Sequence, residues 1–235
     1  MGQPLFIPVD KERELVIATD NAGGIGSKNN DIVDVPYKTV AESLFRVSFM
    51  DCLAVGATPF AVTISNFVGD EVWDELEQTV RNLGHSLGYN LDITGSTESN
   101  MAMSQSAISL SILGWVDTSE KRISISPEMS GVALIGEPLV GEEVLAYPEK
   151  IAPLELFVEV SKQKWVYEIL PVGSKGIQQS IQELKQRNGW KNRDLDIPFD
   201  EKASGGPSTS FMITFDKQYK NEVVHLAGKY TSFIV

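Results

Sequence analysis

Asp20 and the glycines that follow it are the residues of this sequence best placed to bind a ligand. Asp20 comes after a short apolar run, Leu15–Ala18, which predicts a buried strand that ends at Asp20. The next segment contains three glycines: Gly23, Gly24 and Gly26. Glycine permits turns in which the backbone comes close to a ligand, so this segment predicts a turn after a strand that a ligand could approach. The alternative is an ordinary glycine-rich turn that binds nothing.

Asp51 is a second carboxylate, and it is predicted to lie on the inward face of a helix. That face is defined by residues at helical spacing: Leu44, Val47, Asp51 and Ala54. A buried carboxylate needs a cation, hydrogen bonds or a metal. Asp20 and Asp51 could converge on one Mg²⁺, which takes one or two carboxylates together with substrate phosphates. The alternative is that both aspartates are structural residues satisfied inside the protein.

The composition limits the partners of the protein. The chain of 235 residues has a net charge of −12 and no basic cluster, which argues against nucleic acid and anionic membranes. A phosphorylated small molecule stays possible, because a metal and backbone N–H groups bind phosphate without a basic surface. The single cysteine, Cys52, indicates a reducing compartment and lies in an apolar helix, so we expect it to be buried and unreactive. The sequence contains no apolar run of about 20 residues, the length that a membrane-spanning helix needs. We therefore expect a cytoplasmic protein.

The first half of the chain predicts a sheet with two helices. Residues 1–13 form a short polar lead-in. Thr39 and Glu42 form a capping box, which predicts a helix from Thr39 to about Val55. Asp70 is expected to cap the second helix, and His85 in its last turn is expected to lie on the surface. The remaining expected elements are strands at 60–67, 91–94 and 108–112.

The second half predicts a separate α/β domain. The polar stretch 117–130 is interpreted as the linker, which gives domains 1–117 and 118–235. A strand at 169–172 leads into the turn Gly173–Gly176 and a helix at 177–187, an arrangement that presents helix N–H groups to an anion. The turn lacks the spacing of a Walker loop. The remaining expected elements are strands at 132–137, 211–215 and 233–235 and a helical segment at 154–166.

Five segments occur in an order that is typical of one superfamily: TDN (19–21), MDCLAVGATP (50–59), TGST (94–97), SLSILGW (109–115) and SGG (204–206). On these segments the chain resembles the aminoimidazole ribonucleotide synthetase superfamily, which includes thiamin monophosphate kinase, selenophosphate synthetase and a hydrogenase maturation protein. The resemblance covers nearly the whole chain. Its most specific part is the 50–59 segment together with the upstream aspartate.

The resemblance implies an α+β fold of two domains. The N-terminal sheet domain would dimerise through its sheet, and an abbreviated C-terminal α/β domain would follow. The resemblance also implies ATP and Mg²⁺ as cofactors and phosphoryl transfer to a small molecule. In such transfers the metals that bridge the phosphates, and fixed donors, do most of the catalytic work. We therefore expect a homodimeric kinase.

The same resemblance assigns roles to individual residues. The metal ligands would be Asp20, Asp51 and Glu98. The catalytic residues would be Asp20, Asp51 and Lys175. The nucleotide would be bound by Asn21, Gly23, Gly24, Gly26, Lys28 and Thr97. Lys28, Lys175 and Arg46 could offset the charge of the transferred group; the alternative is that each is a solvated surface residue.

Departures from the superfamily pattern reduce the number of activities that we expect of this chain. Ser96 stands where the superfamily has an acidic residue, which leaves Glu98 as a substitute ligand, and Lys175 stands where thiamin monophosphate kinase has aspartate. The segment before Asp20 is too short for the superfamily's glycine-rich N-terminal segment, and the reactive cysteine of selenophosphate synthetase is missing there. With TDN, VPY and PVGSKGI in a short chain, the sequence looks most like the α-ribazole kinases, which phosphorylate a nucleoside in cobamide salvage.

Two alternatives stay open. The chain could be a phosphotransferase similar to thiamin monophosphate kinase or to another member of the superfamily. It could also be a nucleotide-binding scaffold protein that kept the fold and lost catalysis, an interpretation motivated by Ser96 and by the short N-terminal segment.

Overall fold

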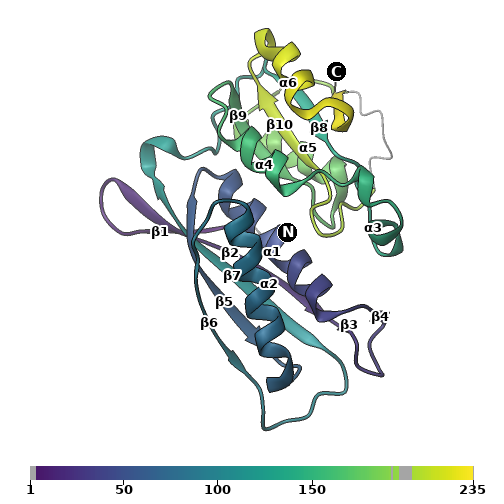
Figure 1. The fold of residues 1–235 in the computed structure, drawn as a ribbon. Coiled ribbons are helices and arrows are strands. Elements are labelled where there is room, and N and C mark those ends of the chain that lie inside the picture. The colour runs from purple at the N-terminus through teal and green to yellow at the C-terminus, as the bar shows by residue number, and fades with distance from the viewer. Residues whose placement is uncertain (1–3, 192, 196–202, 235) are drawn as a thin grey trace. The chain divides into compact units, whose positions relative to one another are not determined.

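A computed structural model of the chain describes residues 4–191, 193–195 and 203–234 (Figure 1). The residues group into two compact units. The N-terminal unit comprises the chain up to residue 53 and residues 57–119, and the C-terminal unit comprises residues 54–56 and the chain from 120 onward. None of the helices in the described ranges combines the length and apolar character that a membrane-spanning helix needs.

The N-terminal unit is built on a five-stranded sheet with the order β1-β2-β7-β5-β6. Its strands are β1 (Leu5–Pro8), β2 (Arg13–Gly23), β5 (Thr58–Asn66), β6 (Asp92–Thr97) and β7 (Ala107–Asp117). Two short strands, β3 (Ile25–Gly26) and β4 (Val33–Asp34), form a separate parallel pair. The helical segments are α1 (Tyr37–Ala54), η1 (Asp70–Val72), α2 (Trp73–Ser86) and η2 (Thr118–Glu120).

The helices α1 and α2 cover one face of this sheet (Figure 1). Along β7, buried residues alternate with more exposed ones, so that Ile108, Leu110 and Ile112 point to the covered face. From α1, Ser48 Oγ donates to the carbonyl of Leu110 at 3.2 Å. A Cβ on Gly114 would lie 2.6 Å from Cys52 Sγ, so the helix packs directly on the backbone of β7 at this glycine.

The opposite face of the sheet carries hydroxyl and apolar side chains. Thr19 and Ser111 are cross-strand neighbours, and Ser111 Oγ donates to Thr19 Oγ1 at 2.9 Å. Toward the other end of the same face, Trp115 stacks on Phe60 with the ring centroids 5.2 Å apart and is still 39% exposed. Leu5 on the edge strand is 58% exposed. This face therefore presents apolar area that the N-terminal unit does not bury.

Several predicted boundaries in the N-terminal half were wrong. The first strand does not end at Asp20, because its pairing with β7 continues as far as Gly23. The expected lead-in contains β1, which pairs antiparallel with β2. The first helix begins at Tyr37, directly after Pro36, so Thr39 lies inside the helix rather than at its cap. Asp70 opens the 3₁₀ turn η1, and the residue at the cap of α2 is Val72 rather than Asp70.

The C-terminal unit is a three-layer α/β arrangement around a four-stranded antiparallel sheet with the order β11-β8-β10-β9. Its strands are β8 (Gly131–Ile135), β9 (Val166–Pro171), β10 (Phe211–Phe215) and β11 (Thr231–Ile234). Its helices are α3 (Glu142–Ala146), α4 (Leu154–Ser161), α5 (Gly176–Asn188) and α6 (Lys220–Ala227), with 3₁₀ turns η3 (Pro148–Lys150), η4 (Lys217–Tyr219) and η5 (Gly228–Tyr230).

Helices on both faces of this sheet explain why β8 and β10 are buried along their whole length. On one face, Ile177 and Leu184 of α5 share a core cluster with Leu134. On the other, the rings of Phe157 in α4 and Phe211 in β10 meet edge to face with centroids 4.8 Å apart. A strand that is buried on both faces consists of a continuous run of apolar residues. The sequence therefore predicted the strands at 132–137 and 211–215.

The segment predicted to be a linker is docked on the C-terminal unit through a buried carboxylate. Glu168 Oε1 accepts hydrogen bonds from Ile125 N at 2.9 Å and from Ser126 N and Oγ at 3.0 and 2.7 Å. Its other oxygen forms an ion pair with Arg187. Trp190 Nε1 donates to the carbonyl of Ser126 at 3.0 Å. The segment 125–126 is therefore held by the domain core and is not a loose tether.

The predictions for the second half were otherwise close. The helix expected at 177–187 is α5, and the strand expected at 211–215 is β10. The helical segment expected at 154–166 is shorter, because α4 ends at Ser161 and Val166 already begins β9. The terminal strand expected at 233–235 begins two residues earlier as β11, and Val235 lies outside the described residues.

Candidate functional site

The ends of three strands define one edge of the N-terminal sheet, called the loop edge below. β2 ends at Gly23, β5 at Asn66 and β6 at Thr97. These strands run in one direction, because β7 pairs antiparallel with β2 and β5 while β6 pairs parallel with β5. The loops that follow the three strands therefore leave the sheet at the same edge. The carboxyl ends of parallel strands are a common position for ligand-binding loops.

The glycine turn after β2 packs closely on its own domain. A Cβ on Gly26 would lie 2.4 Å from Ser106 Oγ and 2.7 Å from the ring of Tyr37, and the residue has a φ of +154°. Gly24 also has a positive φ, of +70°. By contrast, a Cβ on Gly23 would meet nothing within 4 Å. Gly24 and Gly26 are thus required by the shape of the turn, whereas Gly23 is the one of the three beside open space.

Asp31 ties the glycine turn to the start of β7. Its Oδ1 accepts a hydrogen bond from Ser106 N at 2.7 Å. Its Oδ2 accepts from Ser106 Oγ at 2.6 Å and from Lys28 N at 2.9 Å. Burial by itself would raise the pKa of Asp31, but these hydrogen bonds outweigh it and hold the pKa below its usual value.

Two further contacts join the loop 24–34 to the loop 98–106. Lys28 Nζ donates to the carbonyl of Met103 at 3.0 Å, and Gln105 Nε2 donates to the carbonyl of Asn30 at 2.7 Å. Lys28, predicted as a nucleotide-binding residue, is used here to link the loops. Sequence reasoning missed Asp31 and Ser106 because 75 residues separate them and neither belongs to a recognisable motif.

Asp20 lies inside β2, on the helix-covered side of the sheet. It pairs with Leu110 and shares its face with the buried Val16 and Ala18. Partial burial raises the pKa of Asp20, and a hydrogen bond from the backbone of Asn21 only partly offsets this. Within the described residues no lysine, arginine or histidine forms an ion pair with it. A half-buried carboxylate without a cationic partner is suited to receive a cation.

Asp51 lies on α1, near the same part of the sheet. It stands between Ser48, which hydrogen-bonds to Leu110, and Cys52, which packs on Gly114. Both aspartates are therefore on the helix-covered side, around the Leu110–Gly114 segment of β7. Cys52 is fully buried, and burial, together with the negative charge of Asp51, raises its pKa to about 12. The expectation of a buried thiol is confirmed, and its low reactivity stays a prediction that the raised pKa supports.

Glu98 and Thr97 lie at the loop edge and already have protein partners. Glu98 Oε1 accepts from Asn100 N at 2.8 Å and from Met101 N at 3.0 Å, which folds the loop after β6. Thr97 Oγ1 accepts from Asn66 Nδ2 at 3.1 Å. Asn66 is buried, and its side chain also bonds to Gly69 O and Val68 N, so it fixes the end of β5.

The described part of the chain holds no group of three or more His, Cys, Asp and Glu side chains that could bind a metal by themselves. Asp20 and Asp51 remain as a pair, with Glu98 held in the loop after β6. Two carboxylates fit Mg²⁺, whose other ligands are waters and substrate phosphates. The assignment of Asp20, Asp51 and Glu98 as metal ligands stays a prediction.

Asn21 points to the opposite face of the sheet from Asp20, and Lys175 belongs to the other unit. Neighbouring residues of a strand point to opposite faces, so Asn21 faces the open side of the sheet, beside Ser109. Lys175 belongs to the C-terminal unit, where it is exposed and directly precedes α5. His85 is exposed at the end of α2, as expected.

The two glycine motifs of the C-terminal unit are side by side. Gly205 N donates to the carbonyl of Gly173 at 3.0 Å. A Cβ on Gly205 would lie 2.1 Å from the carbonyl oxygen of Val172, so only glycine permits this approach. The turn 173–176 and the SGG segment at 204–206 thus form one loop pair, located where β9 ends and β10 begins.

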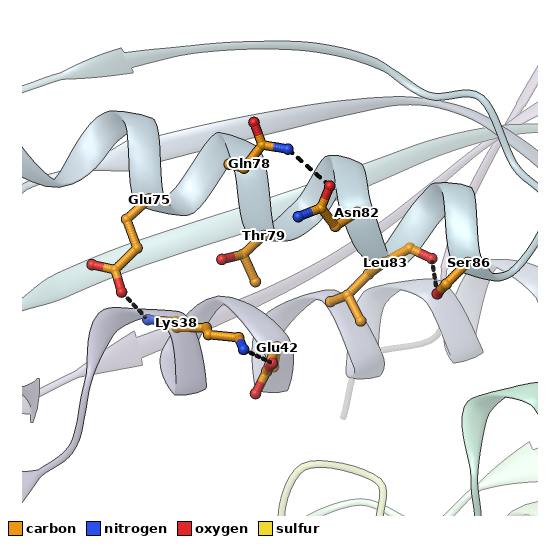
Figure 2. A pocket seen from close by; sticks show the side chains of 8 residues that line it. All are labelled: Lys38, Glu42, Glu75, Gln78, Thr79, Asn82, Leu83 and Ser86. Atoms are coloured by element: carbon orange, nitrogen blue, oxygen red, sulfur yellow. Dashed lines mark hydrogen bonds and ion pairs between the residues drawn. The ribbon is translucent and has the colours of Figure 1, made fainter.

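A groove of about 520 Å³ lies between α1 and α2, and Figure 2 shows the side chains that line it. Lys38 and Glu42 come from α1, and the other lining residues come from α2. Gln78 Nε2 donates to Asn82 Oδ1 at 2.8 Å, and Lys38 N donates to Glu75 Oε1 at 3.3 Å. None of the predicted site residues lines this groove, and its polar side chains bond to one another along the helix surfaces.

Solved structures of other proteins have the same architecture as this chain. The thiamine monophosphate kinase of Aquifex aeolicus superimposes with a TM-score of 0.66 at 15% identity, over 99% of this chain and 87% of that chain. The same type of enzyme, ThiL, complexed with AMPPCP and TMP, gives a TM-score of 0.68 at 14% identity over 99% of this chain and 83% of that chain. The chain has the fold of the aminoimidazole ribonucleotide synthetase superfamily.

A larger protein shares the fold of this superfamily with the chain. PurL of T. maritima, complexed with ATP, superimposes with a TM-score of 0.63 at 14% identity, over 97% of this chain and 41% of that chain. The chain therefore spans about two fifths of the length of PurL. Comparison with protein-family models and with curated protein sequences found no match. The comparison with solved structures thus confirms the predicted α+β fold.

Proposed function

We propose that this protein is an ATP- and Mg²⁺-dependent kinase of a small molecule, with α-ribazole, a nucleoside of cobamide salvage, as the acceptor. The observation that carries the proposal is the position of Asp20, a half-buried carboxylate with a raised pKa and no ion pair among the described residues. It lies on the same side of the sheet as Asp51, in a fold shared with proteins solved with ATP, ADP or AMPPCP bound.

In this proposal each predicted residue has a limited task. Asp20 and Asp51 hold Mg²⁺, which when bound neutralises phosphate charge. The open space beside Gly23 admits the phosphates to the loop edge. Lys175, which is exposed before α5, is available to offset the charge of the transferred group. The acceptor hydroxyl attacks the terminal phosphorus, the bond to ADP breaks, and the hydroxyl proton passes to water or to a carboxylate.

The dimer belongs to the same proposal. The open face of the five-stranded sheet exposes Leu5, Ile7 and Trp115, and its central strands carry hydroxyl side chains such as Thr19 and Ser111. Antiparallel sheets whose second face is exposed to water usually carry polar residues on that face, whereas this face also exposes the apolar Leu5, Ile7 and Trp115. A face that exposes aromatic and aliphatic groups is suited to a second copy of the chain. We propose a cytoplasmic homodimer that associates through this face.

The acceptor is identified by turnover. Purified protein with ATP and Mg²⁺ is assayed for ADP release with α-ribazole, with thiamin monophosphate and without acceptor. Release that requires α-ribazole, together with a phosphorylated α-ribazole product, supports the assignment. ADP release that requires thiamin monophosphate would identify the protein as a thiamin monophosphate kinase instead. This alternative is supported by the fold match, which covers 83–87% of the length of such kinases.

A non-catalytic nucleotide-binding protein is the second candidate. Ser96 occupies the position of an acidic residue, and one carboxylate oxygen of Glu98 is used by the loop backbone. This candidate predicts ATP binding without ADP release for any acceptor. The same assay therefore separates the two functions.

A further inference from the structure

A small hollow at one edge of the C-terminal sheet is lined by three basic side chains. Its volume is about 260 Å³, and its lining residues are Gly131, Val132, Arg193, Phe215, Lys217, Lys220, Phe233 and Ile234. We call it the basic hollow. β8 begins here, and β10 and β11 end here, because Phe215 pairs with Gly131 and Ile234 with Val132. The loop pair 173–176 and 204–206 lies at the opposite edge of this sheet, where β9 ends and β10 begins.

Two of the three cations of the basic hollow contact backbone carbonyls or aromatic rings, and the charge of Glu128 acts on Arg193. Arg193 donates to the carbonyls of Glu128 and Ser130, each at 2.6 Å, and lies over the ring of Trp190 at 4.6 Å. Lys220 Nζ lies 4.6 Å from the centroid of Phe233. Among the described residues, none of Arg193, Lys217 and Lys220 forms a salt bridge.

Two nearby acidic groups also accept hydrogen bonds from other residues. Glu128 Oε1 accepts from Lys191 N at 3.1 Å. The carboxylate of Asp216 accepts from Gln218 N at 3.1 Å and from Gln218 Nε2 at 2.9 Å. In a protein with a net charge of −12, three basic side chains line this one hollow. Cations that share a hollow repel one another, and a bound anion would reduce that repulsion.

The floor of the hollow is kept open by a glycine. A Cβ on Gly131 would lie 2.4 Å from the ring of Phe215, so no larger residue fits between β8 and this ring. The hollow is several times larger than the volume of one water, about 30 Å³. It is slightly smaller than the pockets that bind drug-sized molecules, which begin near 300 Å³. A phosphate group with a small organic substituent has the matching size.

We propose that the basic hollow binds a small phosphorylated molecule. Lys217 and Lys220 would hold the phosphate, Arg193 would supply fixed charge, and the ring of Phe233 would contact the organic part. This site shares no residue with the proposed nucleotide site, since Asp20 and Asp51 belong to the N-terminal unit and the hollow to the C-terminal unit. The proposal does not depend on the kinase assignment.

The test measures binding of inorganic phosphate and of phenyl phosphate to the full chain by calorimetry at fixed ionic strength. The variant is K217Q/K220Q, which removes two exposed lysines, one of them stacked on an aromatic ring. The matched control is K164Q/K229Q, which also removes two exposed lysines, one of them over the ring of Tyr230 at 5.0 Å. D20N is measured in parallel to exclude binding at the proposed nucleotide site.

We expect K217Q/K220Q to weaken binding about tenfold or more, while K164Q/K229Q and D20N bind as the wild type does. Tighter binding of phenyl phosphate than of phosphate identifies a ligand with an organic part, and equal binding identifies phosphate alone as the recognised group. The proposal is overturned if neither probe binds, or if K217Q/K220Q binds as tightly as its control.

Discussion

Asp31 and Ser106, 75 residues apart, are joined by two hydrogen bonds, from the backbone nitrogen and the hydroxyl of Ser106 to the two carboxylate oxygens of Asp31, at 2.7 and 2.6 Å. The pair connects the loop after β2 to Ser106, the residue that directly precedes β7. Both segments belong to the loop edge of the N-terminal sheet. The shape of the glycine turn therefore depends on a contact that no local sequence pattern encodes.

Replacing Asp31 with asparagine should loosen this connection. All three groups that bond to the carboxylate are donors, so the amide nitrogen of asparagine leaves at least one of them without an acceptor. We expect a loss of about 1 kcal/mol in unfolding free energy, together with faster hydrogen exchange in segments 24–34 and 98–106. The control is Asp34→Asn on the exposed strand β4. Unchanged exchange in both segments would show that Asp31 does not hold them.

The Asp31 connection should also fail in acid. The folded protein lowers the pKa of Asp31, so its stabilisation is complete above the ordinary value of 3.8 and is lost as the pH falls below 3.8 through the lower, folded-state pKa. The stability difference between wild type and Asp31→Asn should accordingly shrink over that range. Acid titrations of unfolding free energy for both proteins measure it; a constant difference contradicts this account.

Asp20→Asn should separate binding from stability. Because burial raises the pKa of Asp20, ionised Asp20 opposes folding at neutral pH and not in acid, where it is protonated. The amide should unfold at the same or a higher temperature than wild type at neutral pH, with the difference vanishing in acid. Turnover should fall ~100-fold or more. If Asp20→Asn instead lowers the melting temperature and activity together, Asp20 is structural. Asp92→Asn, on the exposed side of β6, is the control.

The sequence predicts those elements whose side chains alternate in burial or are buried throughout. β7 was recognisable from Ile108, Leu110 and Ile112, and β10 from an unbroken apolar run. The extension of β2 through Thr19–Asn21 was not recognisable, because its polar residues are stabilised by pairing with β7 rather than by burial. β1 depends in the same way on its pairing with β2.

The candidate site was predictable only in part. Helical spacing predicts an inward position for Asp51, and the structure gives it intermediate burial on α1, between the fully buried Met50 and Cys52. The direction of Asn21 follows from strand alternation once β2 is known to continue past Asp20. The contacts of Asp31, Lys28 and Glu98 depend on loops whose shapes are set by partners far away in the chain. Short-range patterns carry no information about such contacts.

Glu168 should be essential for the stability of the C-terminal unit. Its side chain is fully buried, it forms an ion pair with Arg187, and it holds Ser126. Glu168→Ala removes the buried carboxylate that pairs with Arg187 and leaves Arg187 with the longer ion pair to Glu183 at 3.8 Å. Breaking a buried pair typically costs about 3–5 kcal/mol. Glu159→Ala breaks the exposed pair with Lys162 and should cost less than about 1 kcal/mol. Urea unfolding of both variants measures the contrast, and equal losses would contradict the role given to Glu168.

Trp115 should control the oligomeric state. It lies on the open face of the sheet, where it is 39% exposed and stacks on Phe60. Trp115→Glu places a charge on the surface proposed to meet a second copy, so the variant should sediment as a monomer at concentrations where wild type is a dimer. Met129→Glu, an exposed position of the C-terminal unit, is the control. A monomeric wild type would remove the basis for this interface.

Thermal unfolding in the presence of ATP, with and without Mg²⁺, tests the central claim most directly. A ligand that binds only the folded state at 100 times its Kd stabilises by about 2.7 kcal/mol, which for a chain of this size is roughly 5–10 °C. The account predicts a rise of this order that requires Mg²⁺ and is lost in Asp20→Asn. No rise at millimolar ATP, or an equal rise in Asp20→Asn, would contradict the claim that Asp20 helps to form a metal–nucleotide site.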